Sequence, residues 1–556
     1  MTKYAAFLLP VITLMLAACN QPATNDKSSS DDGSAAISAD SIKQYISVLA
    51  ADSFMGRKPF TEGETKTVAY LQKQFAAVGL EPGNGSSYVQ DVPMVNILAT
   101  AAPQMQVTGK KGSFTLKAFD DYIIWTDKPD PKESFDKSEL VFAGYGVVAP
   151  EYKWNDYEGL DVKGKVVMVM VNDPGFWVGD TTLFKGKEMT YYGRWTYKFE
   201  EAARQGARGC LIIHNTAAAS YPFTVQQNNF NTSRLQLDNR GKDVKNCDII
   251  GWLPEGIANK LFVAAGYDST LLVKANKPGF KAVPLNLQLS TTMQVQATYN
   301  KSYNVIGKIT GSKHPEEVII YSAHWDHLGI GTPDEKGDSI YNGALDNASG
   351  TAGLIEIARV FKKMNPAPER TIVFLAVTAE EQGLLGSAYY ALNPVYPAAK
   401  TVADINMDGL NPFGRTKDIV VVGAGQSDLE DYLQQATEKD SGYVSFETHP
   451  EAGYYYRSDH FNFAKVGIPA LFTETGIDVV GHDTAYGKKL QNEYNDKHYH
   501  RPSDTYDAVN WTMEGGVHDL RLLYRVGRRL AFETTMPQWK PGSEFRAARE
   551  KTNHLP

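Results

Sequence analysis

The feature that most constrains the fold is a regular alternation of apolar strands and amphipathic helices after residue 300. Apolar runs typical of buried strands occupy residues 318–322, 371–377, 402–405, 419–422 and 468–472. Stretches with helical apolar spacing lie between them, at residues 350–361, 384–392 and 429–436. This alternation predicts an α/β fold with a mostly parallel central sheet sandwiched by helices. Ligands of such sheets bind beyond the carboxyl ends of the strands, so the residues there are the first candidates for chemistry.

Residues capable of binding metal or moving protons stand at those strand ends and helix starts. They are His324, Asp326, Asp346, Glu380, Glu381, Asp408 and His500. Each has an ordinary alternative when taken alone, because an acid before a helix is often a cap and a lone histidine is often structural. Their common placement at the edge where sites form is hard to obtain by chance. The pattern therefore predicts one shared site.

The residue types in this set favour zinc. The chain has three cysteines in 556 residues, so a thiolate metal site is excluded and imidazoles and carboxylates must serve as ligands. Cobalt and manganese are possible substitutes. Two imidazoles and three carboxylates exceed the needs of one tetrahedral ion with an open position, but they fit two ions about 3.5 to 4 Å apart that share a carboxylate. A neighbouring carboxylate outside the ligand set would then act as the proton acceptor.

A segment of different character interrupts this pattern. Residues 41–49 and 65–78 have helical spacing, but residues 126–295 hold short β-rich runs separated by glycine, proline and asparagine. We expect a separate β-rich domain there, with one helix at residues 197–205. The sequence of this region, including the run at residues 163–167, resembles a protease-associated (PA) insert. Generic strand and turn chemistry is the alternative.

The N-terminus has the pattern of a bacterial lipoprotein signal. Residues 5–18 are apolar but too short to span a bilayer comfortably, and they end in Leu16-Ala-Ala-Cys19, which resembles a lipobox. We therefore expect a signal peptide at residues 1–19, a lipid on Cys19 and a flexible tether at residues 20–39. Asn20 favours the outer membrane of a Gram-negative cell envelope, facing the periplasm or the surface. An ordinary cleaved signal is the alternative.

The charge and the cysteine content limit which binding partners and disulfide bonds the chain can have. Lys and Arg total 56 against 64 Asp and Glu, a formal net charge of -8, so nucleic acid is excluded as a general partner. The composition predicts attachment to a membrane through the lipid anchor only. Cys210 and Cys247 could pair in an oxidising compartment, but the sequence does not fix their geometry, and it leaves the oligomeric state open.

These residues together resemble the M28 family of zinc peptidases, through the motifs around His324, Asp346, the Glu380-Glu381 pair, Asp408 and His500. The resemblance covers residues 40–125 and 296–535 as the peptidase domain, with the PA-like insert at 126–295 between them and a C-terminal tail at 536–556. It implies two Zn²⁺ per chain. The residues that would hold them are His324 and Asp408 for one ion, Glu381 and His500 for the other, and Asp346 as the bridge.

The resemblance also assigns roles outside the ligand set. Glu380 matches the family's general base, and Asp326 matches the acid that orients His324. Tyr499 matches a residue that in some members hydrogen-bonds the tetrahedral oxyanion, although a packed aromatic is an equal alternative for it. In family members the peptide bond after the bridging aspartate is cis, so we expect a cis bond between Asp346 and Asn347.

Three further residues near these motifs receive no catalytic role from the resemblance. His327 and His498 have no ligand counterpart in the family, so we interpret both as structural. Arg457 lies in a segment that borders the family's pocket, and no firm role is assigned to it.

The resemblance implies a dinuclear zinc exopeptidase, and an aminopeptidase that removes N-terminal residues from peptides is the leading hypothesis. Carboxypeptidase or dipeptidase action is the nearest alternative. A glutaminyl-cyclase-like acyltransferase, which uses one zinc ion in related proteins, and a non-catalytic receptor-like protein are weaker alternatives, because every ligand position is filled here.

Overall fold

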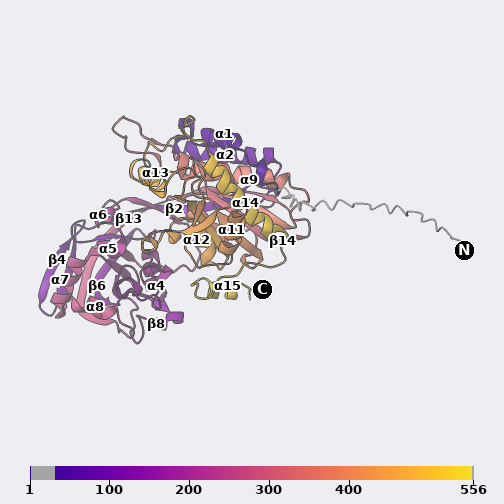
Figure 1. Cartoon of the computed structure of the whole chain (residues 1–556). Coiled ribbons are helices and arrows are strands. Elements are labelled where there is room, and N and C mark those ends of the chain that lie inside the picture. The colour runs from indigo at the N-terminus through magenta and orange to yellow at the C-terminus, as the bar shows by residue number, and fades with distance from the viewer. Residues whose placement is uncertain (2–31, 554–556) are drawn as a thin grey trace.

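The computed structural model describes Met1 and residues 32–553, and Figure 1 shows them as two lobes. The insert lobe comprises residues 102–282, and the main lobe comprises residues 32–88 and 310–553. The expected lipidation motif at Cys19 and most of the expected tether lie outside the described residues. Within the part of the chain that the structure describes, no helix combines the length and apolar character needed to cross a membrane.

A mostly parallel sheet forms the centre of the main lobe, as predicted. Four parallel strands lie side by side in the order β17 (Arg370–Val377), β14 (His314–His324), β18 (Thr401–Asn406) and β21 (Ala470–Thr475). Antiparallel neighbours flank them, with β13 (Val283–Ile309) beside β17 and β19 (Asp418–Val421) beside β21, followed by β20 (Tyr443–Phe446). Every residue of β17 is buried, which is the pattern of a strand covered on both faces.

Helices cover both faces of this sheet. One face packs against α1 (Ala39–Leu49), α2 (Glu62–Val78), α9 (Gly350–Lys362) and α14 (Glu514–Phe532). The other face packs against α10 (Leu385–Leu392) and α12 (His460–Lys465). Because side chains alternate along a strand, Ile319 enters the first core and Ile320 the second. The predicted sandwich of helices around the sheet is therefore present.

The insert lobe has its own sheet. Strands β9 (Val166–Met170), β10 (Gly209–His214) and β12 (Ile249–Pro254) run parallel, and α4 (Trp195–Arg204) packs against β10. These elements match the strand and helix expectations for this region, and the assignment as a PA domain stays a prediction. Cys210 and Cys247 are both buried and both free thiols, so the open question of their pairing is answered in this structure.

The boundary of the insert lies earlier than the expected residue 126. Strands β3 (Gln104–Gly109) and β4 (Gly112–Lys117) pair with each other, and β3 also pairs with β13. Their apolar side chains Met105 and Val107 are buried in the insert core. The expectation that this stretch belongs to the main domain was wrong, because its apolar face completes the insert sheet.

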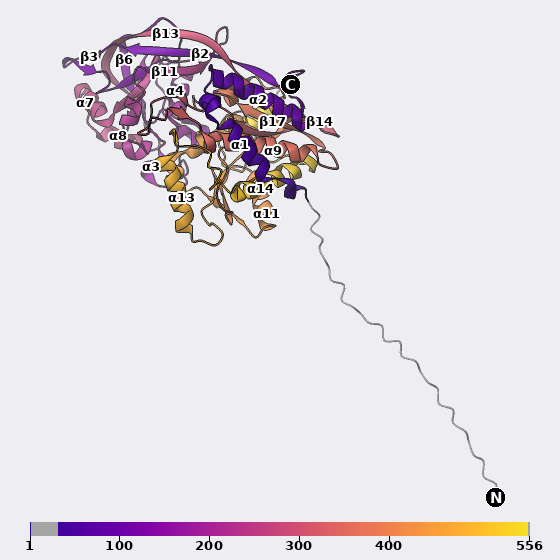
Figure 2. The same cartoon turned by 90° about the horizontal axis from the view of Figure 1, so that it is seen from above.

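Two long strands join the lobes. β2 (Val89–Ala101) and β13, which is 27 residues long, pair along 13 consecutive positions, and Figure 2 shows them as ribbons that run from one lobe to the other. An ion pair between Lys465 Nζ and Glu200 at 2.8 Å and a hydrogen bond from the Tyr456 hydroxyl to Met189 O at 3.1 Å add to this connection. The insert is thus held by paired backbone and side-chain contacts.

Apolar side chains from both ends of the segment 32–553 pack into the main lobe. Ile37, inside the expected tether, is only 3% exposed in the main core, and Arg525 Nε lies 3.0 Å from Asp32. Trp539 and Phe545, in the expected tail, are also buried, and α15 (Arg546–Asn553) follows them. The expected flexibility of residues 20–39 was wrong at Ile37, because this apolar side chain packs into the core of the main lobe.

Candidate metal centre

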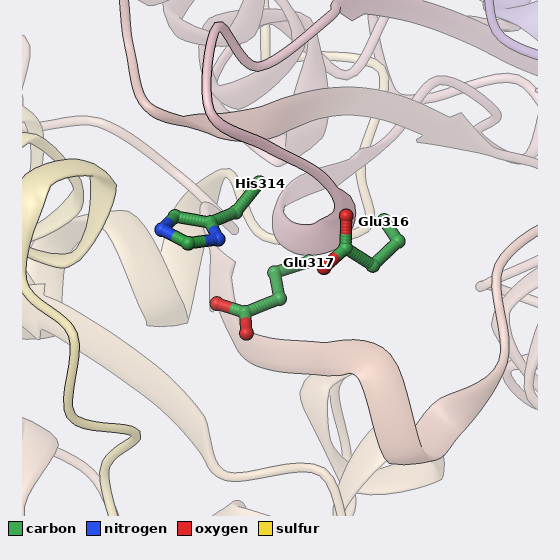
Figure 3. A group of neighbouring side chains, drawn as sticks. All are labelled: His314, Glu316 and Glu317. Atoms are coloured by element: carbon green, nitrogen blue, oxygen red, sulfur yellow. The ribbon is translucent and has the colours of Figure 1, made fainter.

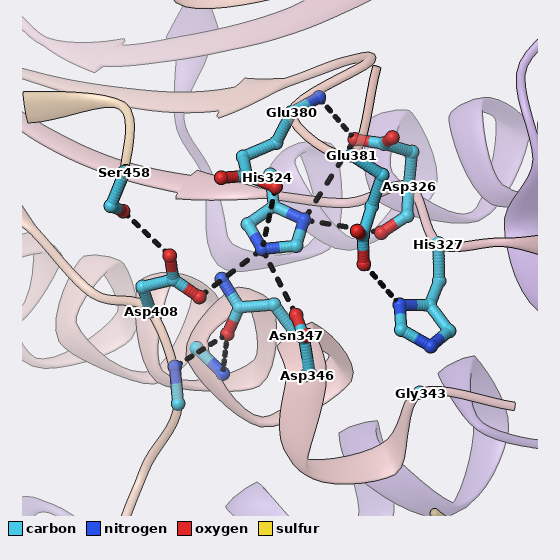
Figure 4. A network of polar contacts seen from close by, with 12 residues as sticks. His324, Asp326, His327, Gly343, Asp346, Asn347, Glu380, Glu381, Asp408 and Ser458 are labelled. Atoms are coloured by element: carbon cyan, nitrogen blue, oxygen red, sulfur yellow. Dashed lines mark hydrogen bonds and ion pairs between the residues drawn. The ribbon is translucent and has the colours of Figure 1, made fainter. Parts of the chain in front are cut away.

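The parallel strands deliver the candidate residues to one edge of the sheet. His324 is the last residue of β14, Glu380 follows the end of β17, and Asp408 follows the end of β18. Asp346 lies in the loop before α9. Figure 4 shows His324 between Asp346, Asp408 and Glu380. Strand ends far apart in the sequence therefore meet, as the carboxyl-end rule predicts.

The first group of candidate ligands is compact. His324 Nε2 lies 3.2 Å from Asp346 Oδ1 and 3.2 Å from Asp408 Oδ1. These three residues offer ligand atoms that all lie within 4.8 Å of one another. Two ligands about 2.1 Å from one tetrahedral ion would be about 3.4 Å apart, so the donor spacing fits a zinc ion.

Asp346 reaches a second group with its other oxygen. His500 Nε2 lies 3.2 Å from Asp346 Oδ2 and 3.1 Å from Glu381 Oε2. The two oxygens of Asp346 thus face two different imidazoles, His324 on one side and His500 on the other. A single carboxylate placed between two nitrogen donors is the arrangement that a bridging ligand requires.

His327, interpreted as structural from the sequence, lies in this second group. Its side chain is fully buried and its Nδ1 is 2.5 Å from Glu381 Oε1. His327, Asp346 and Glu381 also form a set with ligand atoms within 4.8 Å of one another. The signal that could have identified it is its position three residues after His324, in the same loop. The second group therefore contains two imidazoles, those of His327 and His500.

The loop that carries Asp346 is held from two sides. The peptide bond between Asp346 and Asn347 is cis, as expected. The Asn347 side chain donates to Met407 O and accepts from Gly409 N, both at 2.9 Å, which ties this loop to the loop of Asp408. On the other side, Asp504 accepts hydrogen bonds from the backbone N–H groups of Leu345 and Asp346 at 3.0 and 3.1 Å. The sequence reasoning missed Asp504.

Asp326 acts differently from the expectation. Its carboxylate is 3.8 Å from His324 Nδ1, too far for a hydrogen bond, while its main-chain carbonyl lies 3.1 Å from the same nitrogen. The carboxylate instead accepts a hydrogen bond from the backbone N–H of Glu380 at 3.0 Å. Asp326 therefore orients His324 through its backbone and fixes the Glu380 loop through its side chain.

Burial and contacts with the imidazoles shift the pKa values of the site's acids in different directions. Burial opposes the charge on Asp346, but hydrogen bonds from His324 and His500 hold the pKa of Asp346 well below its usual range. Burial and the charge of Asp346 also oppose ionisation of Glu381, yet the nearby imidazoles lower its pKa to about 2. Burial raises the pKa of Glu380 well above its usual range, although His324 opposes this. Asp346 and Glu381 are thus suited to bind cations, and Glu380 to accept a proton.

Tyr499 and His498, which precede His500 in the chain, have different surroundings. Tyr499 is 47% exposed and stacks on the His500 ring, with centroids 3.9 Å apart. This placement disfavours the packed-aromatic alternative and leaves the phenol next to the second group. His498 Nδ1 contacts Ser503 O at 3.0 Å, consistent with a structural role.

A buried arginine from the first sixty residues supports the site. Arg57 is 1% exposed, and its guanidinium donates to the carbonyls of Leu49, Trp325, Asn342 and Gly343 at 2.6 to 2.9 Å. Three of these carbonyls, those of Trp325, Asn342 and Gly343, lie in the loops that carry the ligand residues. Burial lowers the pKa of Arg57 to about 10, against the opposing charges of the site's acids, so it stays cationic at neutral pH. The sequence reasoning gave it no role.

Replacing Arg57 with methionine should destabilise the fold by roughly 3 to 5 kcal/mol, because buried carbonyls left unpaired cost about 1 to 3 kcal/mol each. Urea unfolding monitored by circular dichroism measures the change. Arg240→Met, which removes an exposed guanidinium that pairs with Asp238 and lies over the Tyr299 ring, is the control and should leave the midpoint nearly unchanged. Equal midpoints for both variants would contradict the supporting role.

A third group of possible ligands lies at the opposite end of β14. His314, Glu316 and Glu317 come together there, as Figure 3 shows. Glu317 is 2.5 Å from the Nε of the buried Arg370, so its charge is already compensated. This end of the strand is remote from the sheet edge that forms the site. Glu317 therefore has a structural role, as the partner of Arg370.

Comparisons with known proteins agree with this geometry. Residues 304–524 match the model of Peptidase family M28. A probable zinc metalloprotease of Pyricularia oryzae is 43% identical over 91 residues, 16% of this chain and 17% of that protein. Carboxypeptidase Q of Rattus norvegicus is 39% identical over 93 residues, 16% of this chain and 18% of that protein. The matched segments thus span less than a fifth of these relatives' lengths.

Among solved structures, the aminopeptidase from Aneurinibacillus sp. strain AM-1 is similar to this chain. The match covers 92% of this chain and 97% of that one, with 21% sequence identity and a TM-score of 0.47.

Proposed function

Because residues 304–524 belong to peptidase family M28, we propose that this chain is a zinc-dependent exopeptidase, specifically an aminopeptidase that uses two zinc ions. The observation that carries the proposal is the position of Asp346, whose two oxygens each face a different imidazole at 3.2 Å. An α/β sandwich does not need this arrangement in order to fold, but a carboxylate shared by two cations requires it.

The donor set fits zinc on its chemistry and spacing. His324 and Asp408 would hold one ion, Glu381 with His500 or His327 would hold the other, and Asp346 would serve both. All are nitrogen or carboxylate donors, and no thiolate is among them. Bound there, zinc would supply Lewis acidity toward a peptide carbonyl and toward water.

The residues of the chain supply the proton transfers. Glu380 Oε2 lies 4.0 Å from His324 Nε2, beside the ligand set but outside both compact ligand groups. It would take the proton of the attacking water and give it to the leaving amine. The raised pKa of Glu380 suits this exchange, because burial makes its carboxylate a stronger proton acceptor than an ordinary glutamate. The Tyr499 hydroxyl, next to His500, would donate to the oxygen on which negative charge develops.

Peptides are the proposed substrates, and we propose that the protein acts in the cell envelope, held at the outer membrane by a lipid on Cys19. The sequence motif supports this location, since Leu16-Ala-Ala-Cys19 has the spacing of a lipidation signal.

The direction of cleavage is tested with matched substrates. An aminopeptidase should hydrolyse leucyl p-nitroanilide and fail on its N-acetyl form, while bound zinc measured by atomic emission should approach two ions per chain. A chain that instead cleaves an N-blocked peptide from its carboxyl end would be a carboxypeptidase. Zinc near one ion per chain with cyclisation of N-terminal glutamine would favour the acyltransferase alternative.

A further inference from the structure

An acidic residue lies beside the metal centre without taking part in it. Strands β18 and β21 pair in parallel through Asn406 and Phe472. Two positions further along each chain come Asp408 and Glu474. Neighbouring strands lie about 4.8 Å apart, so Glu474 lies beside the segment that carries Asp408, and it lines one small cavity with Met407 and Gly409, the two neighbours of Asp408 in the chain. This places Glu474 next to the metal centre.

A second carboxylate comes close to Glu474 from the neighbouring strands. On β19, Val420 pairs with Glu474, and Gly423 just beyond this strand donates its backbone N–H to Glu447 Oε1 at 2.9 Å. The other oxygen, Glu447 Oε2, is buried and has no hydrogen-bond partner among the described residues. Burial, with a smaller effect from the charges of Glu447 and Asp408, raises the pKa of Glu474 to about 7.

These two acids lack the partners that structural acids have. Within the described chain, neither Glu474 nor Glu447 forms an ion pair with a lysine, arginine or histidine; Glu447 accepts one hydrogen bond, from Gly423 N–H, and the Glu474 carboxylate accepts none. Arg457 acts on Glu447 only at a distance. Its Nη2 donates to Ala452 O at 2.6 Å, and its guanidinium lies over the Tyr454 ring. A desolvated carboxylate without a partner is costly, so a role outside folding is indicated.

We propose that Glu474, assisted by Glu447, recognises a cationic side chain, lysine or arginine, on the first residue of the substrate. The inference rests on the proposed aminopeptidase function, in which the scissile bond lies at the metal centre and the first side chain occupies the space next to it. A cation there would donate a charge-assisted hydrogen bond to a partly desolvated carboxylate. Without a cation, the site's acids would stay unpaired, which is the basis of strong discrimination.

The test compares lysyl and norleucyl p-nitroanilides, because norleucine has nearly the shape of lysine without its charge. For the zinc-loaded wild-type protein, kcat/KM should favour the lysyl substrate by about 10- to 100-fold. Glu474→Gln should remove most of this preference, with the loss falling on the lysyl substrate. Glu438→Gln, an exposed acid on α11 (Leu429–Glu438), is the matched control and should keep the wild-type ratio.

Two outcomes would overturn the proposal. An equal loss on both substrates in Glu474→Gln would assign Glu474 to the metal centre or to the substrate's α-amine. A wild-type preference for norleucine would exclude a cation site. Binding of free L-lysine and free L-norleucine, measured by calorimetry, provides a readout that needs no turnover. If no anilide is cleaved but L-lysine still binds more tightly and loses this advantage in Glu474→Gln, the proposed function fails while the cation site stands.

Discussion

Replacing Glu380 with glutamine is expected to lower kcat by about two to four orders of magnitude while the protein keeps its zinc. Glutamine has nearly the same shape and keeps the backbone N–H that bonds Asp326, so the loop should hold its place. It cannot take a proton from water. Because Glu380 lies outside both compact groups of ligand atoms, the metal content should not change.

Kinetics and zinc analysis on the same preparation separate catalysis from binding. Glu316→Gln, an acid at the opposite end of β14, is the control and should retain wild-type values for both. A variant at Glu380 that retained near-normal turnover would require a different general base. Loss of zinc together with activity would instead make Glu380 a ligand.

The sheet of the main lobe was predictable because its signals are local and repeated. The runs at residues 318–322 and 371–377 are apolar except for Ser322 and Thr371 at their ends, and a strand buried on both faces needs that pattern. The insert boundary was not predictable in this way. Strands β3 and β4 are half polar, and their place is set by pairing with β13, a strand that lies more than a hundred residues later.

The site was predictable to the extent that strand ends define it. His324, Glu380 and Asp408 follow apolar strands, and the parallel topology brings them together. Arg57 and Asp504 carry no such signal, because their roles consist of hydrogen bonds to backbone groups of distant loops. The carboxylate of Asp326 was assigned to the wrong partner for the same reason. Which donor a short loop presents depends on loop geometry and not on residue spacing.

Asp346→Ala should reduce bound zinc more than the loss of any ligand that serves one ion. The two carboxylate oxygens of Asp346 face His324 and His500, so alanine removes a donor from both groups. Asp408 touches only the first group, which makes Asp408→Ala the matched comparison. We expect about two ions in the wild type, about one in Asp408→Ala and fewer than one in Asp346→Ala.

Activity should fall by about three orders of magnitude or more in Asp346→Ala, because metal polarisation contributes several kcal/mol and each 1.36 kcal/mol is tenfold in rate. Zinc stoichiometry after dialysis measures the first effect, and leucyl p-nitroanilide hydrolysis measures the second. Circular dichroism confirms that each variant is folded before zinc is counted. Equal zinc content in the two variants would show that Asp346 serves one ion only. Two ions retained in Asp346→Ala would place the shared ligand elsewhere, and Glu381, between His327 and His500, would be the next residue to replace.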